Sequence, residues 1–238
     1  MDCIQKVRGE NMNIDIEIEI EKRRITRLCH FVHTNKLLHI LSSEEGIKAV
    51  NFIDDDILKQ NDLLRLDGKK DFINCSIQYP NFWYYNKIKD NNPIFEDWCI
   101  LYIDPLVITY DTTEFCSVNA ATAHGAYIES GYDAFADMYS NKICVNGKYD
   151  RFRPKNKLLN VPTDDQAEVL VYKNIPRKYI TGIAFKNEEI AKNKITQWEV
   201  MNFPKFNVYI APDLFCRAVS DKINGGDIPI EYPYEEGK

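Results

Sequence analysis

Three local features of the sequence combine residue types that could carry chemistry. They are the segment His30-Phe31-Val32-His33, the single Arg65, and Glu168 within residues 163–171. Imidazole, guanidinium and carboxylate groups bind sugars and phosphates and can stabilise charge that develops during a reaction. None of the three is a complete motif, so their meaning depends on whether the fold brings them together.

Glu168 lies in the segment Gln166-Ala167-Glu168-Val169-Leu170-Val171, whose pattern predicts a strand. Alternation along a strand puts Gln166, Glu168 and Leu170 on one side and the three remaining residues on the other. Two interpretations follow, an exposed glutamate on a strand or a carboxylate held in a cleft. Taken alone, the segment favours the exposed glutamate.

His30 and His33 are three residues apart, a spacing at which two imidazoles could contribute to a metal site. No third ligand is evident nearby, so metal binding is the weaker interpretation. In the other interpretation, an imidazole at the end of a strand hydrogen-bonds a ribose or phosphate while Phe31 and Val32 pack beneath it. The residues alone leave structural and ligand-binding roles open.

The motifs of several common enzyme classes are absent from the sequence. It contains no Gly-x-x-x-x-Gly-Lys phosphate loop, no Gly-x-Gly-x-x-Gly, no Gly-x-Ser-x-Gly and no His-Glu-x-x-His. Its seven cysteines are widely spaced and form no Cys-x-x-Cys pair. We therefore expect reduced, mostly packed thiols and no metal.

Composition and charge narrow the function classes further. With 238 residues, 45% of them hydrophobic and 28% charged, the chain predicts a globular protein with a buried core. A net charge of −6 argues against a protein that coats DNA or anionic membrane through bulk charge. No apolar run is long enough for a membrane helix and the first residues lack a signal-peptide core, so we expect a cytoplasmic protein without membrane contact.

Hydrophobic periodicity predicts a mixture of strands and helices. Strands are expected at 73–79, 98–103, 167–172, 180–185 and 206–210, the last of them being the final strand, and helices at 35–41, 81–88, 131–139 and 188–196. A short apolar run at 28–32 predicts a strand or turn that leads into the first of these helices. Because the elements do not alternate regularly, they predict an α+β fold.

Two further segments affect the organisation of the chain. Ile14 to Glu21 alternates isoleucine with acidic residues, which indicates a half-buried strand, although its charges also suit a helix, and both remain open. Residues 104–168 are rich in Thr, Ser, Asn, Ala and Gly, which is typical of a binding loop. We expect one domain over residues 1–238, with an N-terminal extension at 1–23 and a substrate-loop region within 105–166.

Four blocks of the sequence, taken in their order along the chain, form a more specific pattern than any single motif. The first runs from Leu28 to Leu41 as LCHFVHTNKLLHIL and is followed by Glu45-Gly46-Ile47. The others are Ser76-Ile77-Gln78-Tyr79-Pro80-Asn81, Phe115-Cys116-Ser117-Val118-Asn119-Ala120-Ala121 and Asp164-Asp165-Gln166-Ala167-Glu168-Val169-Leu170. Together these blocks resemble the DarT family of DNA-base ADP-ribosyltransferases, over about residues 24–185.

This resemblance implies both a fold and an activity. The fold would be a single-domain ADP-ribosyltransferase-like fold, with a split mixed β-sheet around an NAD cleft and flanking helices. The activity would be transfer of ADP-ribose from NAD⁺, as co-substrate and without metal, to a base of single-stranded DNA. The protein would be the toxin of a toxin–antitoxin or anti-phage system, with a cognate antitoxin ADP-ribosyl hydrolase as partner. Thymine and guanine both remain open as the acceptor base.

The resemblance also implies roles for individual residues. Glu168 falls on the catalytic glutamate of the family, Arg65 near its catalytic arginine, and His30 on the histidine of the NAD site. Lys36 stands where the family often has Asn. The NAD-binding residues expected in this way are His30, His33, Gly46, Arg65 and Tyr79.

The chemistry of NAD⁺ agrees with the role implied for Glu168. Breaking the glycosidic bond develops positive charge on the ribose, and a carboxylate bonded to the 2′-hydroxyl stabilises that state more than the ground state. An arginine suits the pyrophosphate or a position beside the acceptor base, because its planar fork pairs bidentately. Tyr79 and Trp83 are candidates to stack on nicotinamide or on a base.

Contacts to DNA are expected from a few local residues. A small basic and aromatic patch near the substrate loop, which includes Tyr149 and Phe152, is one candidate surface, and a solvated loop with ordinary surface charge is the alternative. The expected DNA-contacting residues are Asn119, His124, Lys148, Arg151 and Arg153. Two other functions stay open, a catalytically silent nucleic-acid or nucleotide binding module and a protein ADP-ribosyltransferase.

Overall fold

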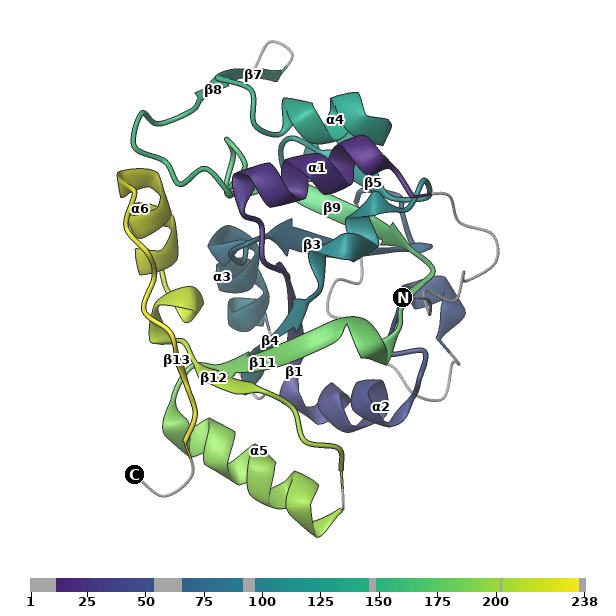
Figure 1. Ribbon diagram of the computed structural model, residues 1–238, viewed down its shortest axis with the longest axis vertical. Helices are drawn as coiled ribbons and strands as arrows, with labels where there is room; N and C mark the ends of the chain where they lie inside the picture. Colours follow the sequence, from purple (N-terminus) through teal and green to yellow (C-terminus); the bar gives the residue numbers. More distant parts are fainter. Residues whose placement is uncertain (1–11, 54–65, 92–96, 146–148, 202, 236–238) are drawn as a thin grey trace, which may run out of the picture.

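A computed structural model of the chain describes residues 12–53, 66–91, 97–145, 149–201 and 203–235 (Figure 1). Within these ranges helices and strands mix around one large sheet, which is the α+β architecture expected from the sequence. No helix in the described ranges has the length and apolar character needed to cross a membrane.

The large sheet has the strand order β13-β12-β11-β4-β1-β3-β9-β5-β6 among the described residues. β11 and β12 run parallel and the other pairs are antiparallel, so the sheet is mixed. The strands are β1 (Leu28–His33), β3 (Phe72–Ile77), β4 (Trp98–Ile103), β5 (Glu114–Cys116), β6 (Ile128–Ser130), β9 (Glu168–Tyr172), β11 (Ile180–Phe185), β12 (Val208–Ile210) and β13 (Tyr232–Pro233). Two small pairs stand apart, β2 (Ile47–Lys48) with β10 (Asn174–Ile175), and β7 (Lys142–Val145) with β8 (Tyr149–Phe152).

The sheet splits between its two central strands. β1 pairs with β4 along all six of its residues, but with β3 only at Leu28↔Ile77 and Cys29↔Ser76. β3 instead pairs with β9 from Phe72 to Cys75. Beyond these two residue pairs β1 and β3 diverge, and their backbones no longer form ladder hydrogen bonds with each other. This divergence opens the sheet at its centre.

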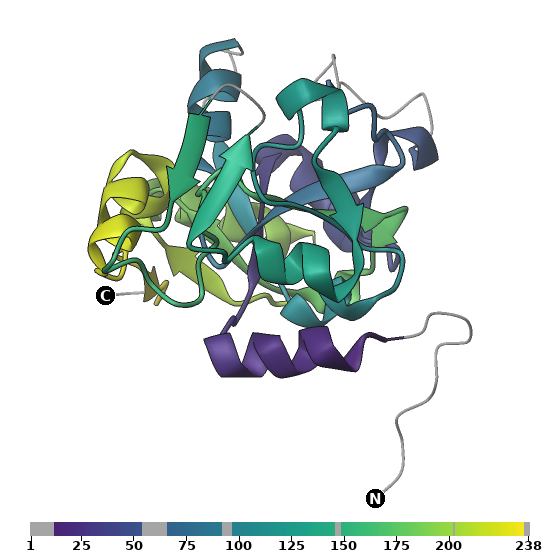
Figure 2. The ribbon, with the colours of Figure 1, turned by 90° about the horizontal axis from the view of Figure 1, so that it is seen from above.

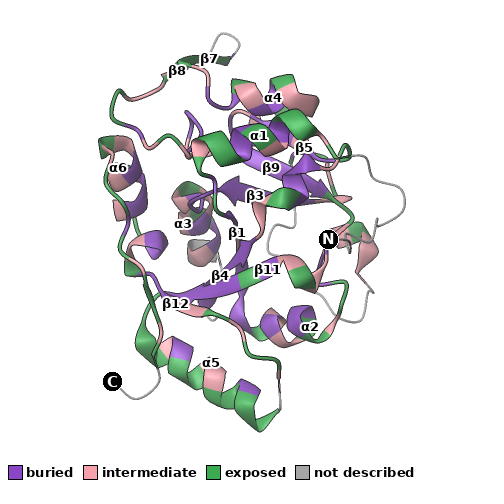
Figure 3. Cartoon of the chain, in the orientation of Figure 1, coloured by how far each residue is buried: buried purple, intermediate pink, exposed green. Residues whose placement is uncertain are grey.

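Helices surround the sheet on several sides. α1 (Ile14–Arg23) and α4 (Gly131–Asp137) contact each other beside β9 and β5, while α2 (Leu37–Ser42) follows β1 at the other end of the molecule (Figures 1 and 2). α3 (Phe82–Asn91) follows β3 and contacts the 3₁₀ turn 212–215, which leads into α6 (Ala218–Gly225). α5 (Glu188–Val200) packs on β11 and β12 with its outer face exposed (Figure 3).

The segment left open between strand and helix forms α1. Asn13 caps it by accepting hydrogen bonds from the backbone N–H groups of Asp15 and Ile16. Ile16 and Ile20, four residues apart, are buried, whereas Ile14 and Ile18 are exposed. A strand would place all four isoleucines on one side, but only two of them are buried here. The cap and the charges that complement the helix dipole therefore favour a helix over the strand that the alternation suggested.

The core lies on both faces of the central strands, which are buried along their length (Figure 3). Alternation along β1 divides its residues between two clusters, with Leu28 and Val32 in one and Cys29 and Phe31 in the other. The four central strand segments at 28–33, 72–77, 98–103 and 180–185 agree with the expected positions to within a residue or two.

Two expectations about the chain need correction. Besides α4, which the sequence predicted, the region 105–166 contains the strands β5, β6, β7 and β8, so it is not one long irregular loop. These strands are only three or four residues long, too short to produce an apolar run or a clear alternation in the sequence. β12 is also not the final strand, because β13 follows α6 and pairs with β12.

Candidate active site

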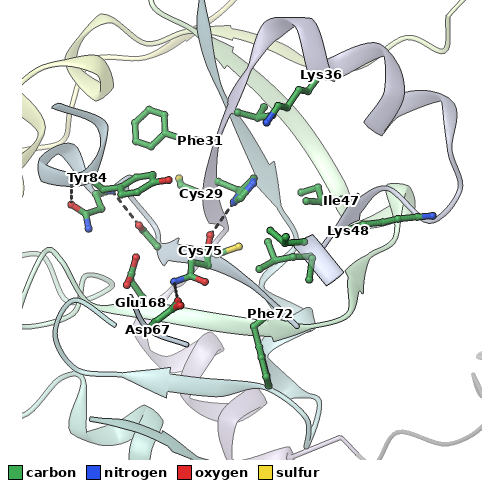
Figure 4. A pocket seen from close by; sticks show the side chains of 18 of the residues that line it. Cys29, Phe31, Lys36, Ile47, Lys48, Asp67, Phe72, Cys75, Tyr84 and Glu168 are labelled. Carbon is green, nitrogen blue, oxygen red and sulfur yellow. Dashed lines mark hydrogen bonds between the residues drawn. The ribbon is translucent and has the colours of Figure 1, made fainter. Parts of the chain in front are cut away.

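A pocket of about 590 Å³ opens where β1 and β3 diverge. Its walls come from β1, from the turn and helix that follow it, from the β2 segment, from β3, from the first turns of α3 and from the start of β9. Seen from close by, Glu168 and Asp67 lie on one side of it, and Lys36 and Lys48 on the opposite side (Figure 4). The pocket therefore has an acidic and a basic end.

Glu168 is the first residue of β9 and is only 8% exposed. Its Oε2 accepts a hydrogen bond of 2.7 Å from the backbone N–H of Ala120, which lies in the loop after β5. Cys116 at the end of β5 pairs with Glu168 across the sheet, so β5 delivers this loop to the carboxylate. A carboxylate fixed in this way can bond a ribose hydroxyl without rearranging.

His30 faces the pocket from β1 and bridges the split in the sheet. Its Nδ1 lies 2.9 Å from the carbonyl oxygen of Asn74 on β3. A carbonyl only accepts hydrogen bonds, so Nδ1 carries the proton and Nε2 is the acceptor of the neutral ring. The Asn74 amide in turn donates to Asp67 Oδ2 at 3.1 Å, so one asparagine holds both a histidine and a carboxylate of the pocket.

The basic end of the pocket is lined by Lys36, His39 and Lys48, with Lys87 from α3 on another wall. Burial lowers the pKa of Lys36 to about 8. Phosphate groups attract such cations, so this end suits the pyrophosphate of a dinucleotide while the acidic end suits the ribose that becomes positively charged. The polarity of the pocket is therefore compatible with a ligand that carries both phosphate groups and a ribose.

Three pocket or near-pocket thiols are unsuited to nucleophilic attack. Burial raises the pKa of Cys29 and of Cys116 to about 12, and burial also raises the pKa of Cys75. These groups stay protonated near neutral pH and act as small apolar side chains. The six described cysteines are all free, and four of them are buried.

Gly46 closes one side of the pocket through its backbone. It has a φ of +66°, and a Cβ there would lie 2.2 Å from the carbonyl oxygen of Ile175. Both facts require glycine at this position. The resulting close approach packs the loop after α2 against β10 and presents main chain to the pocket.

Five of the residues expected from the sequence to contact NAD⁺ or DNA line this one pocket, and Trp83 on α3 is one of them. Glu168, His30, Gly46 and Asn119 meet there from β9, β1 and two loops. Arg65 lies outside the described residues, and Leu66, the first described residue after it, lines the pocket. The roles of these residues in binding and catalysis stay predictions.

His33 and Tyr79, expected in the NAD site, do not line the pocket in the described part of the chain. The His33 ring packs on Trp98, with centroids 3.8 Å apart, and burial lowers its pKa. Tyr79 follows Gln78, whose φ of 66° ends β3 and turns the chain. Tyr79 consequently packs in the second core cluster, with the Arg27 guanidinium 5.4 Å from its ring centroid.

The expected DNA-contacting residues fall at different places. Asn119 lines the pocket, and its side chain accepts a hydrogen bond from the Ala121 N–H. His124 is exposed on a 3₁₀ turn with a φ of 57°, away from the pocket lining. Arg153 bonds the carbonyl oxygens of Leu158 and Val161, which indicates a structural role in its loop.

Of the two remaining expected DNA-contacting residues, Arg151 and Lys148, Arg151 lines a second pocket. Arg151 lies on β8 and pairs with Asp164, at 3.1 Å from Nε to Oδ2, beside this pocket. Lys148 lies outside the described residues. The expected basic patch is thus partly structural, since only Arg151 of the described cations in it faces a cavity.

Asp67 and Asn74 carried no clear signal in the sequence, whereas Ser76 opens one of the four blocks on which the family resemblance rests. Asp67, Asn74 and Ser76 line the pocket, and Ser76 Oγ accepts a hydrogen bond from the Asn81 N–H. Asn81 in turn caps α3 by accepting from the Tyr84 N–H. The Pro80-Asn81 pair before a helical segment was a signal for this cap, whereas nothing in the spacing pointed to Asp67.

The described residues contain no group of three or more histidine, cysteine, aspartate or glutamate side chains that could hold a metal ion. His30 and His33 are an odd number of positions apart on β1, so their side chains leave opposite faces of the strand. That geometry excludes their sharing one metal.

Comparison with known proteins identifies the family. A family model described as "ssDNA thymidine ADP-ribosyltransferase, DarT" matches residues 29–216. The chain belongs to the DarT family. No curated protein matches it.

Solved DarT structures share this fold. Thermus sp. 2.9 DarT in complex with NAD⁺ is 16% identical, with a TM-score of 0.55 over 80% of this chain and 98% of that chain. The same protein in complex with ADP-ribosylated single-stranded DNA is 13% identical, with a TM-score of 0.55 over 81% of this chain and 97% of that chain. Thermosipho africanus DarTG in complex with ADP-ribose is 16% identical, with a TM-score of 0.52 over 80% of this chain and 51% of that chain, so the present chain spans about half its length.

These findings confirm the expected family, the α+β fold and the enzyme class. DarT proteins are NAD⁺-dependent ADP-ribosyltransferases, and NAD⁺ is the expected co-substrate. The divergence of β1 from β3 is the split in the sheet that the resemblance implied.

Proposed function

We propose that this DarT-family chain transfers ADP-ribose from NAD⁺ to a thymine base of single-stranded DNA, with Glu168 as a catalytic residue. The family description supports thymidine as the acceptor. The observation that carries the proposal is the fixed, buried carboxylate of Glu168 at the acidic end of a 590 Å³ pocket whose other end is lined by lysines.

In the proposed reaction the bond between ribose C1′ and the nicotinamide nitrogen breaks, and nicotinamide leaves as a neutral molecule. The bond forms between C1′ and N3 of thymine, the ring nitrogen not already bonded to the DNA sugar, and the proton of N3 is released. Glu168 would hold the 2′-hydroxyl of the ribose and stabilise positive charge on the sugar. His30, held by Asn74 through Nδ1, would accept a ligand hydroxyl at Nε2.

Single-stranded DNA is the proposed substrate form for an electrostatic reason as well. A chain of net charge −6 cannot rely on an extended surface of phosphate contacts. A short site that takes in one base avoids this problem, and an unpaired base enters without the cost of opening a pair. We expect single strands to react at least roughly 10-fold faster than matched duplex.

A biological role as the toxin of a toxin–antitoxin or anti-phage system follows as a proposal. The DarTG protein of Thermosipho africanus, which matches over 80% of this chain, supports an association with an antitoxin partner. The proposed partner is an ADP-ribosyl hydrolase that removes the modification, and the proposed place of action is the cytoplasm. Expression of the chain in cells should then arrest growth, and Glu168→Gln should relieve the arrest.

The direct test is the intact mass of short oligonucleotides after incubation with the protein and NAD⁺. Thymine-containing single strands should gain one ADP-ribosyl group, while strands without thymine and matched duplexes should gain little. Labelled NAD⁺ with a cell lysate serves as the protein-acceptor arm. Labelled protein without labelled DNA would identify a protein ADP-ribosyltransferase, and NAD⁺ binding without any transfer would identify a silent binding module.

A further inference from the structure

A second pocket, of about 510 Å³, adjoins the active-site pocket. The two share Trp83 on α3 and Gln166, two residues before Glu168. β8 lines the second pocket on one side, and α6 lines it on the other, from Arg217 just before the helix to Asn224 in its last turn. None of the functions described so far uses this pocket. A ligand that fills it lies next to whatever occupies the active site.

The rim of the second pocket carries two arginines and two exposed aromatic rings. Arg151 on β8 and Arg217 just before α6 have side chains that are 43% and 69% exposed. The Arg217 guanidinium carbon lies 5.7 Å from the Trp83 ring centroid, so cation and ring form one surface. Trp83 is 40% exposed and Phe152 on β8 is 66% exposed, which is unusual for side chains of this size.

The inner part of the pocket is lined by carboxylates. Asp164 is buried, accepts from the Gln166 N–H at 2.9 Å and pairs with Arg151. Asp165 Oδ2 accepts hydrogen bonds from Ser220 Oγ and from Trp83 Nε1, the latter at 3.4 Å. Within the described residues, Asp165 Oδ1 accepts no hydrogen bond that fixes it. Carboxylates only accept, so the inner part of the pocket selects a ligand that presents N–H donors.

We propose that this second pocket binds the nucleotide next to the acceptor nucleotide and favours a base that carries an exocyclic amino group. The inference rests on the proposed function, because it needs a DNA strand in the first pocket. The neighbouring base would stack on Trp83, its amino group would donate to Asp165, and Arg217, the more exposed of the two arginines, would bind the adjoining phosphate.

The chemistry of the bases gives the preference. Cytosine and adenine present an amino group and guanine presents an amino and a ring N–H, while thymine presents one ring N–H between two carbonyl oxygens. A thymine neighbour would direct those oxygens toward carboxylates, which is unfavourable. The phosphate contact, in contrast, is independent of sequence and accounts for affinity.

Gln166 and Asp165 also connect the second pocket to catalysis. They precede Glu168 in the same segment, and Gln166 lines both cavities. A strand seated in the second pocket would therefore be held close to the carboxylate that acts on NAD⁺. Correct seating of the neighbour would favour correct placement of the acceptor base.

The test measures initial rates of transfer to single-stranded oligonucleotides with one thymine acceptor. The bases on its two sides are varied separately through all four choices. On one of the two sides we expect a thymine neighbour to be slower than cytosine, adenine or guanine by roughly 10-fold in kcat/KM. A neighbouring thymine can itself be modified, so products are counted by the position that carries the ADP-ribosyl group.

Variants separate the two kinds of contact. Arg217→Ala should raise KM for every oligonucleotide by roughly 5-fold and reduce the salt dependence of log KM by about one phosphate contact. Asp165→Asn should reduce the difference in kcat/KM between oligonucleotides with different neighbouring bases, since an amide both donates and accepts hydrogen bonds. Lys192→Ala, which removes an exposed cation from α5, is the matched control and should change neither quantity.

Each outcome bears on one proposal. Transfer at equal rates for all neighbours on both sides would overturn the inference and leave the proposed function intact. Unchanged KM and salt dependence in Arg217→Ala would likewise overturn the phosphate contact. Absence of transfer to every oligonucleotide by the wild-type protein would instead contradict the proposed function itself.

Discussion

The backbone N–H of Ala120 holds Glu168 Oε2 at 2.7 Å. This contact joins the loop after β5 to the start of β9, so the orientation of the carboxylate depends on a segment 48 residues away. A backbone donor keeps its direction whatever the side chain at position 120. Glu168 is therefore held in place without a ligand, as the catalytic role proposed for it requires.

Replacing Glu168 by glutamine should lower kcat by roughly 100-fold or more, because it removes a charge that acts mainly in the transition state. The amide oxygen can still accept from Ala120, so the fold and NAD⁺ binding should persist. Transfer to a labelled oligonucleotide and NAD⁺ titration measure the two effects. Glu129→Gln on the exposed strand β6 is the matched control. Turnover near that of the wild type would remove Glu168 from catalysis.

His30→Ala should raise KM for NAD⁺ more than it lowers kcat, because the proposed role of the imidazole is to bind the ligand and not to act on the breaking bond. The KM for the oligonucleotide, measured on the same variant, provides the internal control and should stay near its wild-type value. Loss of kcat at unchanged KM would instead assign His30 a role in the chemical step.

Transfer should proceed unchanged in the presence of a chelator. The expectation follows from the opposite directions of His30 and His33 on β1 and from the lack of a three-residue ligand group in the described ranges. The measurement is the initial rate with and without chelator, followed by addition of a divalent ion. A fall in rate that the ion restores would require a metal site made by other residues.

The sequence predicted the site best where a residue type and a strand pattern coincide. Glu168 and His30 lie on strands with apolar alternation, and both reach the pocket. His33 and Tyr79 share those strands or their ends but pack in the core, since pattern alone cannot tell on which side of a split sheet a cleft opens. The position of the split depends on β1 and β3 pairing over only two residues, a property of tertiary packing.

Other parts of the site were beyond sequence reasoning for physical reasons. Asp67 reaches the pocket through hydrogen bonds to Asn74 and to the Lys69 N–H, which are set by a turn and carry no periodic signal. Alternation at 14–21 predicted a strand as readily as a helix, and the choice depended on the cap at Asn13 and on ion pairs of Glu19 with Lys22 and Arg23.

Lys157 is buried in the loop that leads to β9, and its Nζ donates a hydrogen bond of 3.0 Å to the Thr163 carbonyl oxygen. Burial lowers the pKa of Lys157 from 10.5 to about 8. Between these values the unfolded chain binds a proton that the folded chain has released, so this group makes stability rise with pH over that window. Below pH 8 the folded protein bears the full cost of a buried charge.

Lys157→Met removes the charge and keeps most of the volume. The free energy of unfolding of the variant relative to the wild type should therefore be highest at pH 7 and fall by up to ~3 kcal/mol as the pH approaches 10.5. Buried tyrosines and thiols titrate in the same range, but they occur in both proteins and cancel in the difference. Denaturant unfolding at a series of pH values measures this difference, with Lys192→Met as the exposed control. A difference independent of pH would show that Lys157 is not held at a lowered pKa.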